Sequence, residues 1–584
     1  MDERTANQII DHLTFIYGPD VARQTAGTLL AALADFRAAH PQLSADTAVP
    51  RLSQHDTILI TYGDMVQEPD KTPLHTLHNF LQQHVAGLIS TVHLLPFYPY
   101  SSDDGFSVID YRAVDPALGS WADVARLGRH FRLMFDAVIN HISAQSDWFQ
   151  GFLRHESPYR DYFTVVEPGT DLTAVFRPRA LPLLHTVDTA VGPRSVWTTF
   201  SADQIDLNYA NPELLLAVID TLLFYAAQGA EFIRLDAIAF IWKEIGTNCL
   251  HRPQAHRIIQ LLRTVLDAAA PRVALITETN VPHEENIAYF GDGHNEAQMV
   301  YNFSLPPLTL HAFHTGRADT LSRWAASLTT PSPQTTFFNF LASHDGIGLT
   351  PARGILSDTA VTRMADRVQS LGGFVSYKSN SDGTQSAYEL NINYLDALGD
   401  PDTPGEPLAL TARRFLCAQA IMLALRGVPG IYFHSLFGSR NWRDGVAQSG
   451  RYRTINRQKL AKSDLDSDLR QAGGLRRLVF AGYRRLLAAR TSHPAFHPSG
   501  EQAIIPLHEA VLAVWRGGGD NRAPVLCLHN VSARPVRFDL TAVAQFPAAL
   551  RLKDLIGGAV FAFRPQARSL SLQPYQVLWL TAVD

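Results

Sequence analysis

Cysteine is scarce in this sequence. The 584 residues include three, Cys249, Cys417 and Cys527, which lie far apart. An odd, scattered set is no disulfide framework, and a reducing compartment such as the cytoplasm fits it best. The sequence also has no CxxC pair and no HExxH motif of the kind that binds zinc. We therefore expect no metal and no cofactor.

Long apolar runs are missing as well. No stretch reaches the roughly 18 uncharged apolar residues that suggest a membrane span. The first residues, MDERTANQIIDHL, are acidic where a secretion signal is basic, and no apolar segment follows them. We expect a cytoplasmic protein with no membrane partner.

Positive charge is not in excess. Fifty Lys and Arg face 55 Asp and Glu, which gives a net charge of −5. Without a basic field, nucleic acid is an unlikely partner. The hydrophobic fraction of 46% and charged fraction of 18% are those of a globular protein with a large core. We expect a monomer or a homodimer, and composition does not separate the two.

Eight short, β-rich apolar runs recur along the chain, and amphipathic stretches separate many of them. The runs cover residues 57–63, 90–98, 132–140, 231–240, 272–279, 299–305, 335–345 and 430–435. Continuously apolar strands are typical of a buried parallel sheet. Eight strand–helix units predict a closed (β/α)8 TIM barrel, an α/β fold. A doubly wound sheet would need a glycine-rich fingerprint after the first strand, and TYGDMVQEPD is not one.

The predicted barrel occupies residues 56–500, after N-terminal helices in 1–55. Two connections, 141–205 and 346–408, are too long for ordinary loops and predict inserted subdomains. Both follow a strand on the side where barrel active sites are built. The alternating segments of 501–584 predict a C-terminal all-β domain.

Polar residues end four of the apolar runs. They are Asn140 and His141, Arg234 and Asp236, Glu278, and finally His344 and Asp345. A single acid at a strand end is usually a cap or a local ion pair. Four such ends converge on one mouth in a closed barrel, however, and predict a catalytic cluster.

Three carboxylates at one mouth suit glycoside transfer. One acid protonates the leaving oxygen, while another carboxylate attacks or stabilises the cationic centre. Neighbouring carboxylates also push their pKa values apart, so that one stays protonated near neutrality. Arg234 lies two residues before Asp236, on the same side of its strand, and would hold it ionised.

At these residues the sequence resembles the α-amylase family, glycoside hydrolase family 13. Its four motifs occur in order, as DAVINH, IRLDAIAF, ITET and FLASHD. The resemblance implies that Asp236 is the nucleophile and Glu278 the general acid/base. It implies that Asp345 is the third acid, which binds sugar hydroxyls and distorts the ring. Residues that position the glucosyl group are, by the same resemblance, Arg234, His141 and His344.

Within that family the chain is most similar to the sucrose phosphorylase subfamily. The segments PFYPYSSDDGFSVIDY, VWTTFSADQIDLN and TINRQ carry the similarity. It implies that Asp103 and Arg457 reach the glucose, that Phe106 walls the acceptor side, and that Phe200 and Gln204 belong to an aromatic clamp. For the two phenylalanines, ordinary core packing is the alternative.

Phosphorolysis also needs fixed positive charge for the incoming phosphate. Arg177 and Arg179 match an Arg-Pro-Arg segment of the subfamily, and we expect Arg179 to bind phosphate; a solvated arginine pair is the alternative. The second insertion matches a subfamily loop that moves between acceptor-binding and phosphate-binding arrangements. There Tyr388 matches a tyrosine that contacts phosphate.

Calcium is bound by many members of the wider family, through an asparagine that matches Asn140 and acids in the first insertion. Members of the sucrose phosphorylase subfamily do without it. No dense Asp/Asn loop with calcium-site spacing is evident in this sequence. We therefore expect the site to need no metal.

These features predict a retaining α-glucoside phosphorylase. Its partners would be a small α-glucoside and inorganic phosphate, and it would form α-D-glucose 1-phosphate reversibly through a glucosyl-enzyme. A hydrolase or transglucosidase with the same acids is the alternative, and phosphate dependence separates the two. A catalytically inactive binding protein is disfavoured by the complete set of three acids.

The acceptor is left open among sucrose-type, glucosylglycerol and glucosylglycerate substrates. The chain length is similar to that of the longer members, which act on the last two. Glu389 stands where sucrose-specific members commonly carry glutamine, and we expect its carboxylate to face the leaving group. A second anion about 4 Å away would be repelled by up to about 4 kcal/mol at a dielectric near 20. We therefore expect glycerol to be preferred over glycerate, since the sequence reveals no arginine that would cancel this charge.

Overall fold

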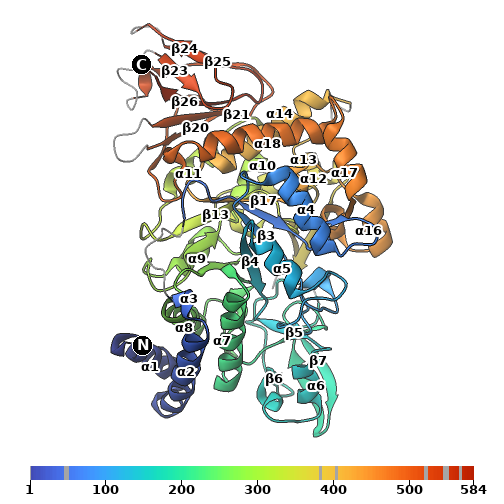
Figure 1. Ribbon diagram of the computed structural model, residues 1–584. Helices are drawn as coiled ribbons and strands as arrows, with labels where there is room; N and C mark the ends of the chain where they lie inside the picture. Colours follow the sequence, from blue (N-terminus) through green and yellow to red (C-terminus); the bar gives the residue numbers. More distant parts are fainter. Residues whose placement is uncertain are drawn as a thin grey trace.

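The computed structural model describes residues 2–44, 52–179, 181–379, 384–400, 405–517, 524–543, 551–564 and 568–583. Eight parallel strands close into a barrel at the centre of the molecule (Figure 1). In spatial order they are β1 (Ile58–Thr61), β17 (Val428–Tyr432), β13 (Thr336–Phe340), β12 (Met299–Tyr301), β11 (Ala274–Thr277), β10 (Ala230–Leu235), β4 (Arg132–Ala137) and β3 (Thr91–Leu94). Each coincides with one of the eight apolar runs, so the predicted barrel is confirmed.

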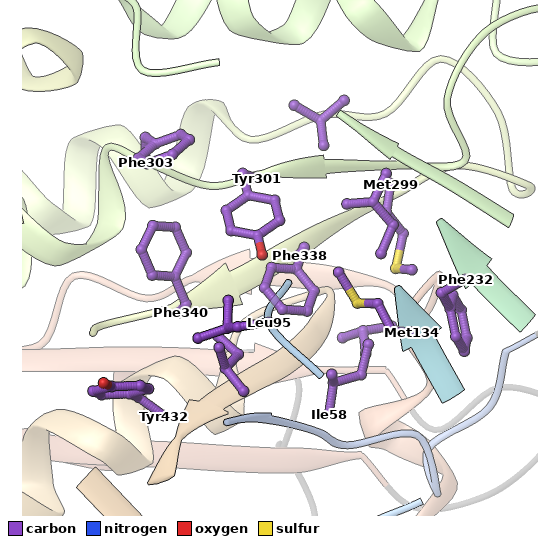
Figure 2. Packing of buried hydrophobic residues seen from close by; sticks show 14 of the residues in the cluster. Ile58, Leu95, Met134, Phe232, Met299, Tyr301, Phe303, Phe338, Phe340 and Tyr432 are labelled. Atoms are coloured by element: carbon purple, nitrogen blue, oxygen red, sulfur yellow. The ribbon is translucent and has the colours of Figure 1, made fainter. Parts of the chain in front are cut away.

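Large side chains fill the inside of the barrel (Figure 2). The rings of Tyr301 and Phe338 have centroids 4.5 Å apart, and both residues are buried. Gly430 on β17 makes room for this packing, because a Cβ there would come within 2.2 Å of the Phe338 ring. Burying one such aromatic ring contributes roughly 1.5–3 kcal/mol, so the interior is a stabilising core and not a channel.

Amphipathic helices surround the barrel. They include α4 (Pro73–Val85), α5 (Trp121–Gly128), α7 (Pro212–Ala227), α8 (Pro253–Ala269), α10 (Leu305–Thr315), α14 (Leu408–Ala424) and α18 (Leu475–Thr491). Helices α4, α7 and α8 begin with proline, whose fixed φ and missing N–H suit the first helical position. None of the helices in the described part of the chain is long and apolar enough to cross a membrane.

Two N-terminal helices extend this layer. Helices α1 (Glu3–Tyr17) and α2 (Pro19–Ala39) pack on each other and on α8 (Figure 1). Their apolar faces are buried, and the Tyr17 hydroxyl donates to the Tyr209 carbonyl at 2.9 Å.

Both long connections are structured. Between β4 and α7 lie β5 (His141–Ser143), α6 (Asp147–Leu153), β6 (Val165–Val166), β7 (Leu184–Thr189), β8 (Gly192–Trp197) and β9 (Gln204–Asp206). Between β13 and α14 lie β14 (Ile347–Gly348), α12 (Asp358–Ser370), β15 (Phe374–Ser379), β16 (Gln385–Asn391) and α13 (Tyr394–Ala397). Their small sheets are antiparallel, and both insertions leave the barrel at the carboxyl end of a strand.

The C-terminal region is all β. Its main sheet has the order β19 (Gln502–Ile504), β20 (Val511–Arg516), β21 (Val525–Asn530), β26 (Val577–Ala582), β23 (Arg551–Asp554) and β24 (Val560–Ala562). The buried Arg516 joins this sheet to the barrel, because its guanidinium donates to the carbonyls of Ala424 and His497, each at 2.8 Å. The predicted fold class is confirmed in this region too.

Candidate active site

The carboxyl ends of β4, β10, β11 and β13 meet at one mouth of the barrel, where residues of both insertions close over them. A cavity there is lined by most of the residues singled out in the sequence: Asp103, Phe106, His141, Arg179, Phe200, Gln204, Asp236, Glu278, His344, Asp345, Tyr388 and Glu389. The structure therefore brings together side chains that are up to 286 residues apart in the chain, as Asp103 and Glu389 are.

Arg234 is buried beside two of the lining acids, Asp236 and Glu278, and is 2% exposed. Its guanidinium donates to Asp236 Oδ1 at 2.7 Å and also to Asp136. Asp136 is itself fixed by His93, whose Nε2 donates to it at 2.7 Å. Burial would raise the pKa of Asp136, but Arg234 and His93 outweigh it and lower that pKa. Asp136 is thus a charged anchor for Arg234, a role that the sequence did not reveal.

Glu278 lies farther from the positive charge of Arg234 than Asp236 does. It lies 3.7 Å from Arg234 and accepts a hydrogen bond from the Ala237 backbone N–H at 3.0 Å. Burial, reinforced by the negative charges of Asp236 and Asp345, raises the pKa of Glu278 to about 7. Burial also raises the pKa of Asp236, but Arg234 and His141 oppose that shift. With the closer cation, Asp236 ionises first and Glu278 keeps the proton.

Asp345 is held ionised by cations on the opposite wall. Arg453 Nη1 lies 2.5 Å and Arg457 Nη2 3.8 Å from Asp345 Oδ1. Burial would raise the pKa of Asp345, but Arg453 and Arg457 outweigh it and hold that pKa well below its usual range. A charged carboxylate in a buried cavity is a strong acceptor for sugar hydroxyls.

His344 is neutral and stacked. Burial lowers its pKa to about 3, and its ring lies parallel to Phe106 with centroids 4.6 Å apart. Its Nδ1 is buried and has no hydrogen-bond partner among the described residues.

Serine hydroxyls tie the loop that carries Asp103 to the first insertion. Asp203 accepts hydrogen bonds from Ser101 and Ser102 at 2.5 Å each and from Ser107 at 2.7 Å. Across the same seam, His141 and Gln204 donate to the Phe106 carbonyl at 2.9 and 3.0 Å. These bonds fix Phe106 and the Phe200–Gln204 segment on one wall of the cavity.

Glu389 is not an unpaired carboxylate. It is 2% exposed, and the Arg453 guanidinium donates to both of its oxygens, at 3.0 and 2.6 Å. Gly346 permits this arrangement, because a Cβ there would lie 2.6 Å from Glu389 Cγ. The premise that no arginine cancels the charge of Glu389 is therefore wrong, and so is the reason given for preferring glycerol.

Arg453 is the main residue that the sequence did not reveal. It binds Glu389 and Asp345 together, yet it lies 64 positions from one and 108 from the other. The one signal available was local. Arginines recur at 451, 453 and 457, beside the TINRQ segment already singled out.

Arg457 has a different environment from the one expected. Its Nε donates to the His344 carbonyl at 2.8 Å, and its Nη1 pairs with Asp104 more closely than with Asp103, which is 3.8 Å away. It borders a second cavity, of about 420 Å³, beside the first. The two cavities share Asp103, Arg179, Phe200, Gln204, Glu389 and Arg453. We call the second one the outer chamber.

A lysine occupies the oxygen cluster that the family resemblance associates with calcium. Lys243 Nζ lies 2.9 Å from Asn140 Oδ1, 2.6 Å from Asp206 Oδ2 and 2.5 Å from the Phe240 carbonyl. An ammonium group thus supplies the positive charge among these buried oxygens. In the part of the chain that the structure describes, no group of three or more His, Cys, Asp or Glu side chains could hold a metal.

The chain is similar to known proteins in both sequence and fold. Residues 85–351 match the family described as "Alpha amylase, catalytic domain". The chain is 49% identical over 578 residues to a protein named glucosylglycerate phosphorylase from Spirochaeta thermophila, covering 97% of each. It is 28% identical over 478 residues to a sucrose phosphorylase from Streptococcus mutans, covering 80% of this chain and 93% of that one. A crystal structure of sucrose 6F-phosphate phosphorylase from Thermoanaerobacter thermosaccharolyticum has the same fold, with a TM-score of 0.70 and 23% identity, covering 82% and 94% of the two chains.

The barrel and its three acids define an enzyme of the α-amylase type. The chain belongs to glycoside hydrolase family 13, the α-amylase family, in its sucrose phosphorylase subfamily. Its activity is that of an α-glucoside phosphorylase.

Proposed function

We propose that the substrate pair is α-glucosylglycerate and inorganic phosphate. The observation that carries this proposal is the charge of the outer chamber, which is lined by four arginines and two carboxylates. Two of the arginines, Arg453 and Arg457, are paired with acids. The other two, Arg179 and Arg451, have no carboxylate within ion-pair distance among the described residues. An anionic leaving group is favoured beside such unpaired guanidinium groups.

The reaction would proceed by double displacement with retention. Asp236 attacks the anomeric carbon of the glucosyl group, and Glu278 gives its proton to the departing glycerate oxygen. An oxygen of phosphate then attacks the same carbon, the bond to Asp236 breaks, and Glu278 takes up the proton of the attacking phosphate. Each step is reversible because the glucosyl ester and the sugar phosphate are both activated donors. Asp345, kept ionised, would bind the sugar hydroxyls throughout.

The strong likeness to glucosylglycerate phosphorylases over the whole chain supports the same substrate. The pairing of Glu389 with Arg453 removes the electrostatic objection to an anionic acceptor. We therefore replace the expected preference for glycerol with a preference for glycerate.

Initial rates in the synthetic direction test this proposal. The enzyme would receive α-D-glucose 1-phosphate and one of D-glycerate, glycerol, fructose or fructose 6-phosphate, and phosphate release would be measured. We expect D-glycerate to give a kcat/KM at least about tenfold above that of glycerol, the value of one extra charge-assisted contact. A higher rate with glycerol or fructose would contradict the proposal.

A further inference from the structure

Arg179 lies where the two cavities join. It lines both the inner cavity, with Asp236 and Glu278, and the outer chamber. Tyr388 lines the inner cavity together with Arg179, whose charge opposes the burial that raises the pKa of Tyr388 to about 12. Among the residues that the structure describes, Arg179 has no acidic partner. Of the arginines around the outer chamber, Arg451 is unpaired too, but it is exposed and lines only the outer chamber.

Glycerate and phosphate each bond to the anomeric carbon through one oxygen. Their negative charges lie at similar distances from that oxygen. Phosphate carries its charged oxygens two bonds beyond the oxygen that bonds to the anomeric carbon. Glycerate bonds through a hydroxyl on C2 or C3, so its carboxylate carbon is two or three bonds beyond the bonded oxygen. Measured from Glu278, which protonates that oxygen, both anions fall in the same small region. A planar guanidinium can bind either a carboxylate or a phosphate through paired N–H donors.

We propose that Arg179 holds both anions in turn, first the carboxylate of the departing glycerate and then the incoming phosphate. This inference rests on the proposed function and adds to it a shared acceptor residue. Glycerate and phosphate then exclude each other, because both would occupy the same region beside the oxygen that bonds to the anomeric carbon. Arg453 is less suited to this role, because its positive charge is already paired with Asp345 and Glu389.

The test compares Arg179→Gln with Arg177→Gln. Arg177 is the matched control, because it lies two residues away, is exposed, and bonds to the Leu181 carbonyl instead of lining either cavity. Three rates would be measured for each variant. They are glycerate glucosylation from α-D-glucose 1-phosphate, phosphorolysis of glucosylglycerate as a function of phosphate, and the first burst of fluoride from α-D-glucosyl fluoride. The fluoride burst measures formation of the glucosyl-enzyme. Fluoride is its leaving group and does not depend on binding by the Arg179 guanidinium.

For Arg179→Gln we expect the kcat/KM values for glycerate and for phosphate each to fall at least about 30-fold, the lower range for loss of a charged partner. The fluoride burst should stay within about threefold of wild type, as should all three rates of Arg177→Gln. Arg179→Lys should recover part of both acceptor activities together, since it restores the charge but not the paired donors.

Unequal losses would overturn the inference. If phosphate use falls and glycerate use does not, another group binds the carboxylate. An equal fall in the fluoride burst would mean that Arg179 acts on the donor. If wild-type enzyme does not glucosylate glycerate at all, the proposed function itself fails and this inference fails with it.

Discussion

The inner cavity and the outer chamber are built in different ways. The inner cavity takes its acids from the ends of neighbouring barrel strands, and parallel pairing fixes their register, as between Arg234 and Ile276 on β10 and β11. The outer chamber is assembled from both insertions and from residues 450–457. Its ion pairs join residues that no regular strand register relates. In the proposed reaction, the barrel would supply the groups that act on the glucosyl group, and the insertions would supply those that bind the acceptor.

The two regions also differ in how charge is arranged. In the inner cavity Arg234 faces Asp136, Asp236 and Glu278, so one proton is retained among the acids. In the outer chamber the carboxylates are matched by arginines, and two guanidinium groups remain without an acidic partner among the described residues. In the proposed reaction, the negative charge of the inner cavity would serve glucosyl transfer, and the positive charge of the outer chamber would select an anionic acceptor.

The largest effect should come from the inner cavity. Asp236→Asn removes the proposed nucleophile, so the glucosyl ester of the proposed mechanism could not form. We expect phosphorolysis to fall at least about 10⁴-fold, as for other catalytic units that act together. Circular dichroism and the melting temperature serve as the check on folding. Substantial residual turnover by a folded protein would point to a different nucleophile.

In the outer chamber, Arg453→Ala would leave Glu389 buried without a partner and Asp345 without its closest cation. Removing one member of a buried ion pair costs about 3–5 kcal/mol in the free energy of unfolding. The double variant Arg453→Ala/Glu389→Gln removes the stranded charge and should recover at least about 1 kcal/mol of that loss. Urea unfolding of the three proteins measures both effects. A single variant as stable as wild type, or a double variant no better than the single, would refute the pairing.

The dependence of kcat/KM on pH tests whether Glu278 carries the proton in the inner cavity. With a raised pKa near 7, Glu278 stays protonated below that pH and loses its proton above it. Because glycerate needs that proton to leave, phosphorolysis should decline about tenfold per pH unit above 7. Glu278→Gln, assayed by the fluoride burst, should lack this decline. A decline centred near pH 4.5 would instead mean that Glu278 is ionised in the free enzyme.

The smallest effect concerns the contacts of Lys243, which lie between the barrel and the first insertion. Since Lys243 supplies the charge among Asn140, Asp206 and the Phe240 carbonyl, chelation should change neither activity nor melting temperature. Enzyme treated with EDTA would be compared with enzyme given calcium. A loss on chelation that calcium restores would show that a metal, and not Lys243, supplies the charge at these contacts.

The sequence predicted the barrel and the three acids because both depend on local pattern. Apolar runs mark buried strands. Asp236 and Glu278 directly follow β10 and β11, and Asp345 lies five residues after the end of β13. The ion pairs of the outer chamber could not be predicted in this way. Glu389 reaches Arg453 only because Gly346 leaves space and β16 runs beside the 450–457 segment. Lys243 was overlooked for a similar reason, since its partner Asp206 lies at the far end of an insertion.

The most direct test of the whole account is the fate of α-glucosylglycerate with and without phosphate, followed by proton NMR. We expect α-D-glucose 1-phosphate and glycerate to form in equal amounts when phosphate is present, with the α configuration retained. Without phosphate, free glucose should form at under about one hundredth of that rate, a difference of roughly 2.7 kcal/mol in activation free energy. Release of glucose at the same rate in both samples, or formation of the β anomer, would contradict the account.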